Sequence, residues 1–314
     1  MRRRSILAAG LARPLLAQGD SNRIVLAFGP GAGGDGIGRL LAEAASRTSL
    51  GATVVENRAG ANGNIGAGAA ARARPDGRTA LFAFDPVFSI NPHVYPSLGF
   101  DPAALEHIAL LGNFPLALLV SPASGITDVA GLAAAAQARG LLYSSGGAGS
   151  PGHLGMEAFR LRAGIRPDRF DHVPMRGNAP AIAELLAGRV QAGMLAIGGG
   201  VQMVQDGTLR AIATSGAARD PALPAVPTLI EAGWPEFSIR FAFTLSLPRG
   251  TPDAARQAWM AAAHALFDAP AGRARIAAFG VVPELADAAA AQAWVTTAHA
   301  RWGEVVRATG MRVE

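Results

Sequence analysis

Two glycine-rich segments contain most of the residues in this chain that could bind a ligand. The first, 28–36, reads FGPGAGGDG, and the second, 144–153, reads SSGGAGSPGH. Loops with so few side chains leave backbone N–H groups free to donate hydrogen bonds. A helix that starts at such a loop adds about half a positive charge. Each segment is therefore predicted to bind a small anion.

The sequence contains no complete motif of a known catalytic or metal-binding site. The six histidines include no H-x-x-x-H pair, and the acidic residues are not clustered at the spacing of metal ligands. The segment 148–152, AGSPG, lacks the first glycine of the G-x-S-x-G nucleophile elbow. With no cysteine, the chain also has no thiol nucleophile. We predict no catalytic residue, no metal and no cofactor, and thus a protein that is not an enzyme.

One enzymatic alternative stays open, an exported dinucleotide-binding oxidoreductase that uses the Gly29 to Gly34 loop. Residues 29–34 match G-x-G-x-x-G, and Glu56 ends the next predicted strand, where a carboxylate that binds ribose is needed. Pro30 removes one N–H group from this loop. No acid–base pair for hydride transfer follows. The loop therefore favours binding over catalysis.

Each loop lies between a predicted strand and a predicted helix. Short runs of Val, Ile and Leu alternate with helical stretches after residue 22, which is typical of an α/β fold. The predicted strands are 23–28, 53–56, 79–84, 107–111, 116–121, 141–145, 171–174, 192–197, 210–214 and 240–247. From residue 251 to the end, the sequence predicts almost only helix.

The return of a strand at 240–247 after a self-contained middle block predicts two domains joined by two crossings. Domain 1 is predicted to comprise 22–118 plus 235–314, and domain 2 to comprise 119–234. The crossings are placed near 118–120 and 233–237. Both glycine-rich loops then face an interdomain cleft, where ligand sites tend to lie.

Composition limits the partners and the location of the protein. All 28 basic residues are Arg, they are scattered, and only 6% of the residues are aromatic, so no nucleic-acid partner is predicted. No apolar run after the first residues reaches the roughly 18 residues of a membrane-spanning helix. Arg2 to Arg4, a short apolar stretch and the possible cleavage site LLAQ predict an export signal over residues 1–18. A Sec or twin-arginine-like route would make the protein periplasmic.

A set of motifs occurs in a specific order from about residue 22 to the C-terminus. The motifs are 24–41 (IVLAFGPGAGGDGIGRLL), 54–58 (VVENR), Gly60, 63–67 (GNIGA), 75–77 (PDG), 90–92 (INP), 145–154, 172–174 (HVP), 179–181 (APA), 222–224 (ALP), 226–228 (VPT) and 250–252 (GTP). This set resembles the substrate-binding receptors of tripartite tricarboxylate transporters, the Bug or TctC family. The resemblance implies a bilobed type II periplasmic-binding-protein fold. It also implies a receptor that captures a small carboxylate between its lobes and delivers it to the membrane subunits of the transporter; we expect a monomer.

The resemblance further implies which residues bind the ligand, chiefly through backbone N–H groups and bridging waters. The implied residues are Phe28, Gly31, Gly33, Gly34 and Asp35 in the first loop, Ser145, Gly147, Gly149, Ser150 and His153 in the second, and Gly177 and Ala179 in a third segment.

Asp85 and Arg176 are charged departures from the family pattern near the inferred cleft. Either the ligand is an amino acid whose ammonium group meets Asp85, or Asp85 and Arg176 form a salt bridge that closes part of the pocket. We favour the salt bridge.

Overall fold

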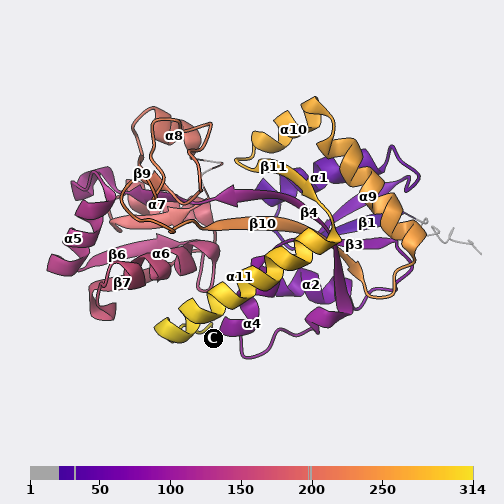
Figure 1. Ribbon diagram of the computed structural model, residues 1–314, viewed down its shortest axis with the longest axis horizontal. Coiled ribbons are helices and arrows are strands. Elements are labelled where there is room, and N and C mark those ends of the chain that lie inside the picture. Colours follow the sequence, from indigo (N-terminus) through magenta and orange to yellow (C-terminus); the bar gives the residue numbers. More distant parts are fainter. Residues whose placement is uncertain (1–20, 32, 197, 199, 314) are drawn as a thin grey trace, which may run out of the picture.

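Two β-sheets, each covered by helices, form the two lobes of the protein (Figure 1), for which a computed structural model describes residues 21–31, 33–196, 198 and 200–313. The strands are β1 (Asn22–Leu26), β2 (Thr53–Asn57), β3 (Thr79–Phe84), β4 (Leu105–Pro115), β5 (Ala117–Val120), β6 (Leu141–Ser145), β7 (Phe170–Pro174), β8 (Ala192–Leu195), β9 (Arg210–Thr214), β10 (Arg240–Pro248) and β11 (Val282–Ala286). The helices are α1 (Gly33–Ala45), α2 (Asn64–Ala71), α3 (Pro86–Ser89), α4 (Asn91–Val94), α5 (Val129–Arg139), α6 (Pro151–Arg162), α7 (Asn178–Leu186), α8 (Val201–Gln205), α9 (Asp253–Phe267), α10 (Pro270–Ala277) and α11 (Ala288–Thr309).

The first lobe contains a six-stranded sheet in the order β11-β4-β10-β3-β1-β2, and the second a five-stranded sheet in the order β7-β6-β8-β5-β9. In the first sheet, β1 pairs in parallel with β2 and β3, whereas β10 is antiparallel to both β3 and β4. In the second, β6 pairs in parallel with β7 and β8. The predicted two-lobed α/β fold is confirmed.

The interior strand β1 is apolar on both faces because helices cover both sides of its sheet. Ile24 and Leu26 belong to the core cluster that includes the buried face of α1, and Val25 belongs to a separate cluster with small residues of α2. The end of β1 is therefore fixed, and the first glycine-rich loop begins from a defined position.

The chain passes between the two sheets twice, at Leu116 and between Thr214 and Arg240. The first passage lies just before the predicted range 118–120, and the second includes 233–237. Buried Ser215 connects the two passages: its hydroxyl accepts a hydrogen bond from Leu116 N–H at 2.8 Å and donates one to Ile239 O at 2.6 Å. The boundaries of domains 1 and 2 stay a prediction, because they depend on where the lobes separate in motion.

Strand β11 contradicts the prediction that the region after residue 251 is almost only helix. It pairs antiparallel with β4 at the edge of the first sheet. Its five residues, VPELA, include a proline and a glutamate, both of which are rare in strands. Pairing with β4, rather than local propensity, therefore determines this strand.

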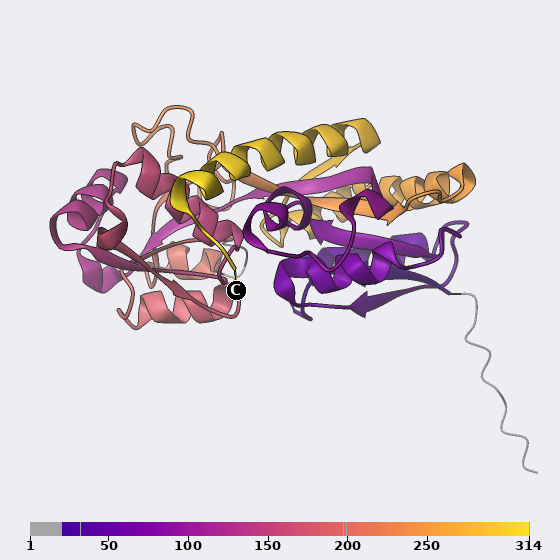
Figure 2. The ribbon, with the colours of Figure 1, turned by 90° about the horizontal axis from the view of Figure 1, so that it is seen from below.

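Helix α11 runs from the first lobe to the second (Figures 1 and 2) and contacts both β4 and α6. Trp302 of α11 stacks on Phe241 of β10, with ring centroids 5.4 Å apart and planes inclined by 6°. Within the described part of the chain, no helix has the length and apolar character needed to cross a membrane. The predicted export signal, residues 1–18, lies outside the described residues.

Candidate ligand-binding site

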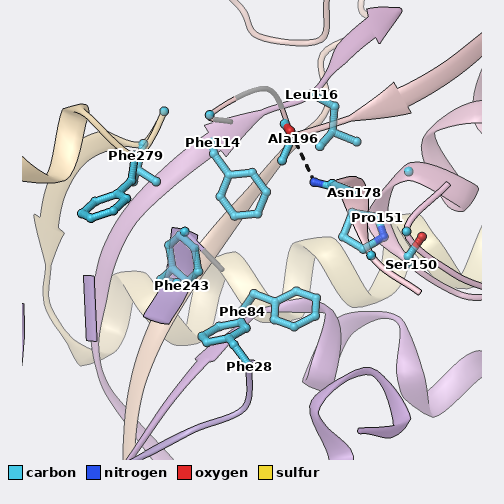
Figure 3. A pocket seen from close by; sticks show the side chains of 18 of the residues that line it. Phe28, Phe84, Phe114, Leu116, Ser150, Pro151, Asn178, Ala196, Phe243 and Phe279 are labelled. Carbon is cyan, nitrogen blue, oxygen red and sulfur yellow. Dashed lines mark hydrogen bonds between the residues drawn. The ribbon is translucent and has the colours of Figure 1, made fainter. Parts of the chain in front are cut away.

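A cavity of about 290 Å³ lies between the lobes, next to the carboxyl ends of β1, β3, β6 and β8 (Figure 3). This is where ligands bind in open α/β sheets. Its lining residues are Phe28, Gly33, Gly34, Asn62, Phe84, Phe114, Leu116, Gly146, Ser150, Pro151, Gly152, Gly177, Asn178, Ala196, Gly198, Phe243, Phe279, Gly280 and Val281.

Three helices begin at this cavity: α1 at Gly33, α6 at Pro151 and α7 at Asn178. The N–H groups in the first turn of a helix have no partner within it, and they carry partial positive charge. None of the residues found to line the cavity has a charged side chain. A negatively charged ligand would thus be held by the helix N-termini. The polar side chains at the cavity stabilise its walls, because Asn62, Ser150 and Asn178 donate to Ala148 O, Ser145 Oγ and Ala196 O.

The Asp35 side chain fixes the first loop instead of lining the cavity. Its carboxylate accepts hydrogen bonds from Gly31 N–H (3.0 Å), Arg39 Nε (3.1 Å) and Asn57 Nδ2 (2.8 Å). Burial acts to raise the pKa of Asp35, but these hydrogen bonds outweigh it and hold the pKa below its usual range. Asp35 is therefore ionised at neutral pH and helps to shape the turn between β1 and α1.

A buried network shapes the second loop. The imidazoles of His153 and His172 stack with centroids 3.7 Å apart, and His153 Nδ1 accepts the Gly149 N–H at 3.1 Å. Ser145 Oγ lies 2.7 Å from His172 Nε2 and donates to Gly147 O at 2.9 Å. Burial lowers the pKa of His153 to about 3 and that of His172 to about 4, so both rings are neutral at pH 7. These residues hold the loop in place but are not among those lining the cavity.

A second hollow with a volume of about 630 Å³ adjoins the cavity and is called the outer hollow here. It shares Gly33, Gly177 and Phe279 with the cavity. Gly31, Ala179 and the exposed Arg176 line only this outer hollow. Arg176 thus lies in the hollow that also contains the starts of α1 and α7, at Gly33 and Asn178.

Comparison with known protein families agrees with this geometry. The profile described as "Tripartite tricarboxylate transporter family receptor" matches residues 37–311. The chain belongs to this receptor family. The resemblance noted in the sequence is therefore confirmed, and so is the bilobed periplasmic-binding-protein fold that it implied.

Relatives match the receptor over nearly its whole length. Protein BugT of Bordetella pertussis is 29% identical over 98% of this chain and 96% of its own. The solved structure "R. palustris Rpa4515 with adipate" has a TM-score of 0.84 and 29% identity, over 93% of this chain and 98% of that one. The solved structure "MatC (Rpa3494) from Rhodopseudomonas palustris with bound malate" has a TM-score of 0.80 and 28% identity, over 91% and 98%.

The dinucleotide alternative is not supported for the receptor. Glu56 Oε1 forms an ion pair with Arg58 at 2.6 Å, and Glu56 Oε2 lies 3.7 Å from Arg23. The strand order β2-β1-β3-β10, with β10 antiparallel, also differs from the 3-2-1-4-5-6 order of dinucleotide-binding folds. The G-x-G-x-x-G match thus reflects a loop at a helix N-terminus, not a nucleotide site.

The predicted salt bridge between Asp85 and Arg176 is wrong. Asp85 is fully buried at the end of β3, where its carboxylate accepts Ala242 N–H of β10 at 2.7 Å and Ser89 Oγ–H at 2.8 Å. Arg176 is exposed at the outer hollow. Asp85 is not among the residues lining either hollow, so its position does not favour a contact with a ligand ammonium group. Burial raises the pKa of Asp85 to about 7, although its hydrogen bonds act to lower it.

Replacing Asp85 by asparagine is expected to flatten the pH dependence of stability. Because the folded pKa is raised, wild-type Asp85 contributes stability that is fully present below pH 4 and is lost as the pH rises to about 7. The wild-type advantage over Asp85→Asn should therefore decrease between pH 4 and 7, by at most about 1.4 kcal/mol per pH unit. Urea unfolding across this range measures the difference. Asp253→Asn, at a carboxylate 93% exposed, is the matched control; equal slopes for both variants would contradict the expectation.

The structure thus brings only some of the predicted residues to the cavity. Phe28, Gly33, Gly34, Ser150 and Gly177 line it, whereas Gly31, Arg176 and Ala179 line the outer hollow, and Asp35, Asp85, Ser145, Gly147, Gly149 and His153 line neither. Sequence reasoning missed Asn178, although it begins a helix after a glycine, the signal that identified the first two loops. It also missed Phe114, Phe243 and Phe279, which no local pattern distinguishes from core residues.

Proposed function

We propose that this protein is a periplasmic receptor that captures a small carboxylate in the interlobe cavity and delivers it to the membrane subunits of a tripartite tricarboxylate transporter. One observation carries the proposal: in the part of the chain that the structure describes, three helix N-termini, one from the first lobe and two from the second, meet at a cavity whose lining residues carry no charged side chain. A carboxylate would neutralise the partial charges of both lobes together and so favour their closure.

Two structural relatives support a carboxylate as the ligand. One was solved with adipate and the other with malate, and both are similar to this chain over more than nine-tenths of its length. These two compounds share carboxylate groups and differ in the chain between them. The shared group is the one that the helix N-termini suit.

We further propose that the receptor binds its ligand without chemically converting it. We also propose that the receptor is a monomer. The titratable groups near the second loop, His153 and His172, are used in the buried network and are neutral at pH 7. The export signal predicted over residues 1–18 supports a periplasmic location. The structural relative BugD, 25% identical to this chain, is itself described as a periplasmic binding protein.

A carboxylate is expected to raise the melting temperature of the mature protein. At 100 times its dissociation constant, a ligand adds about 2.7 kcal/mol to the free energy of unfolding, which corresponds to several degrees. Thermal unfolding with a panel of mono- and dicarboxylates, followed by calorimetry, measures this effect. The corresponding neutral amides are the controls, and nuclear magnetic resonance should recover each acid unchanged. A panel in which no acid stabilises the protein more than its amide would refute the proposal.

A further inference from the structure

The cavity has an aromatic side and a polar side. Five phenylalanines line it, whereas Ser150 and Asn178 lie across from most of them (Figure 3). The five are Phe28, Phe84, Phe114, Phe243 and Phe279. Phe28 and Phe84 stack with centroids 5.3 Å apart, and Phe243 lies 5.7 Å from Phe28 and 5.2 Å from Phe114. These separations are typical of favourable aromatic pairs, so the rings hold one another in place.

Two of these rings also pack directly on glycines of α1. A Cβ atom at Gly34 would lie 2.7 Å from Phe28 Cε2, and one at Gly36 would lie 2.3 Å from Phe279 Cζ. The glycines therefore make room for the rings, which rest against the first turns of the helix. An apolar wall thus borders one of the three helix N-termini that would hold the carboxylate.

The described side chains on the aromatic side of the cavity offer no cation for a second negative charge. Among the residues that line the cavity, no arginine or histidine lies on the aromatic side. The faces of aromatic rings carry negative partial charge, so a second carboxylate packed against them would lose water and gain no charged partner. An aromatic ring in the same place would stack on the phenylalanines and bury its apolar surface.

We infer that the ligand is a monocarboxylic acid whose body is a single aromatic ring. This inference rests on the proposed function and narrows it, since the two relatives compared above were solved with adipate and malate. The cavity volume of about 290 Å³ is near the lower end of the range for small-molecule sites, which suits one ring with a short side chain. The carboxylate points toward the start of α6, and the ring lies against Phe28 and Phe243.

Calorimetry on the wild-type protein tests the inference without any substitution. Phenylacetate is expected to bind at least tenfold more tightly than adipate, and more tightly than cyclohexylacetate. Adipate binding as tightly as phenylacetate, or more so, would overturn the inference but leave the proposed function standing. Equal or tighter binding of cyclohexylacetate would overturn the aromatic ligand class. If none of the three acids bound, the inference would be overturned, and the wider panel of mono- and dicarboxylates would decide the proposed function.

A positive charge placed on the aromatic side of the cavity should shift the preference of the protein from phenylacetate toward adipate. Phe279 is 36% exposed on the turn after α10, so Phe279→Arg is expected to fold and to put a guanidinium group at the apolar side of the cavity. The affinity ratio of adipate to phenylacetate should then rise at least tenfold, or 1.4 kcal/mol. Leu161→Arg adds the same charge at a position of α6 that is 38% exposed and outside the lining. An unchanged ratio in Phe279→Arg, or an equal change in both variants, would overturn the inference.

Discussion

Replacing Gly149 by valine is expected to weaken carboxylate binding roughly 100-fold, because overpacking at a contact between the lobes costs about 1–3 kcal/mol. Gly149 has a φ of +71°, and its Cβ would lie 2.8 Å from Val313 Cγ2 and 3.1 Å from Asn62 Nδ2. Asn62 donates a hydrogen bond from the first lobe to Ala148 O of the second at 2.9 Å. The new side chain would therefore separate the lobes at the loop that carries the helix N-terminus.

The matched control for this variant is Gly164→Val. Gly164 also lies in the second lobe with a φ of +63°, but a Cβ there would have no neighbour within 4 Å. The Gly164→Val variant should lower the stability of the protein through backbone strain alone and leave its dissociation constant for the carboxylate unchanged. Calorimetry measures the affinity, and X-ray scattering measures the separation of the lobes. Similar losses of affinity in both variants would show that strain, not the contact between the lobes, is responsible.

Replacing Gly198 by alanine is expected to reduce affinity at least tenfold. A Cβ on Gly198 would lie 2.4 Å from the carbonyl oxygen of Phe279 and 3.1 Å from its carbonyl carbon. This contact joins the end of β8 in the second lobe to the turn between α10 and β11 in the first. Backbone atoms cannot rotate away as a side chain can, so the turn after α10 and the second lobe must move apart. This movement costs about 1–3 kcal/mol.

Scattering with saturating ligand should show a more open form for Gly198→Ala than for the wild type. Gly68→Ala is the control, since its new methyl group would meet the movable guanidinium end of Arg72, just after α2, at 3.2 Å, and Phe100 Cβ at an ordinary contact distance of 3.6 Å. A Gly198→Ala protein with wild-type affinity and a wild-type scattering profile would contradict this expectation. It would show that the turn after α10 can shift without separating the lobes.

The sequence was sufficient to predict features that depend on local chemistry. The apolar run of β1 followed by glycines predicted both a buried strand and a helix N-terminus, and the structure places Gly33 and Gly34 at the cavity. The same reasoning located Ser150 at the start of α6. These features are local because a helix exposes its first N–H groups wherever it lies in the fold.

Features that depend on distant contacts were not predictable in the same way. Asp85 and Arg176 are both charged and both follow strands, but only the fold shows that Asp85 faces the backbone of β10 and that Arg176 faces solvent. Phe243 and Phe279 are likewise ordinary apolar residues in the sequence. They become cavity residues only because β10 pairs with β3 and because the turn after α10 reaches the cleft.

The stacked pair formed by Trp302 and Phe241 gives the protein an intrinsic optical signal. Phe241 lies on β10, next to the second passage between the lobes, and Trp302 lies on α11, which contacts both lobes. Arg240 also lies over the ring of Trp294, 5.3 Å from its centroid. A rotation about β10 would alter both contacts and so change the intensity and wavelength of tryptophan emission. Because neither indole lines the cavity, such a change would report movement of the lobes and not quenching by the ligand.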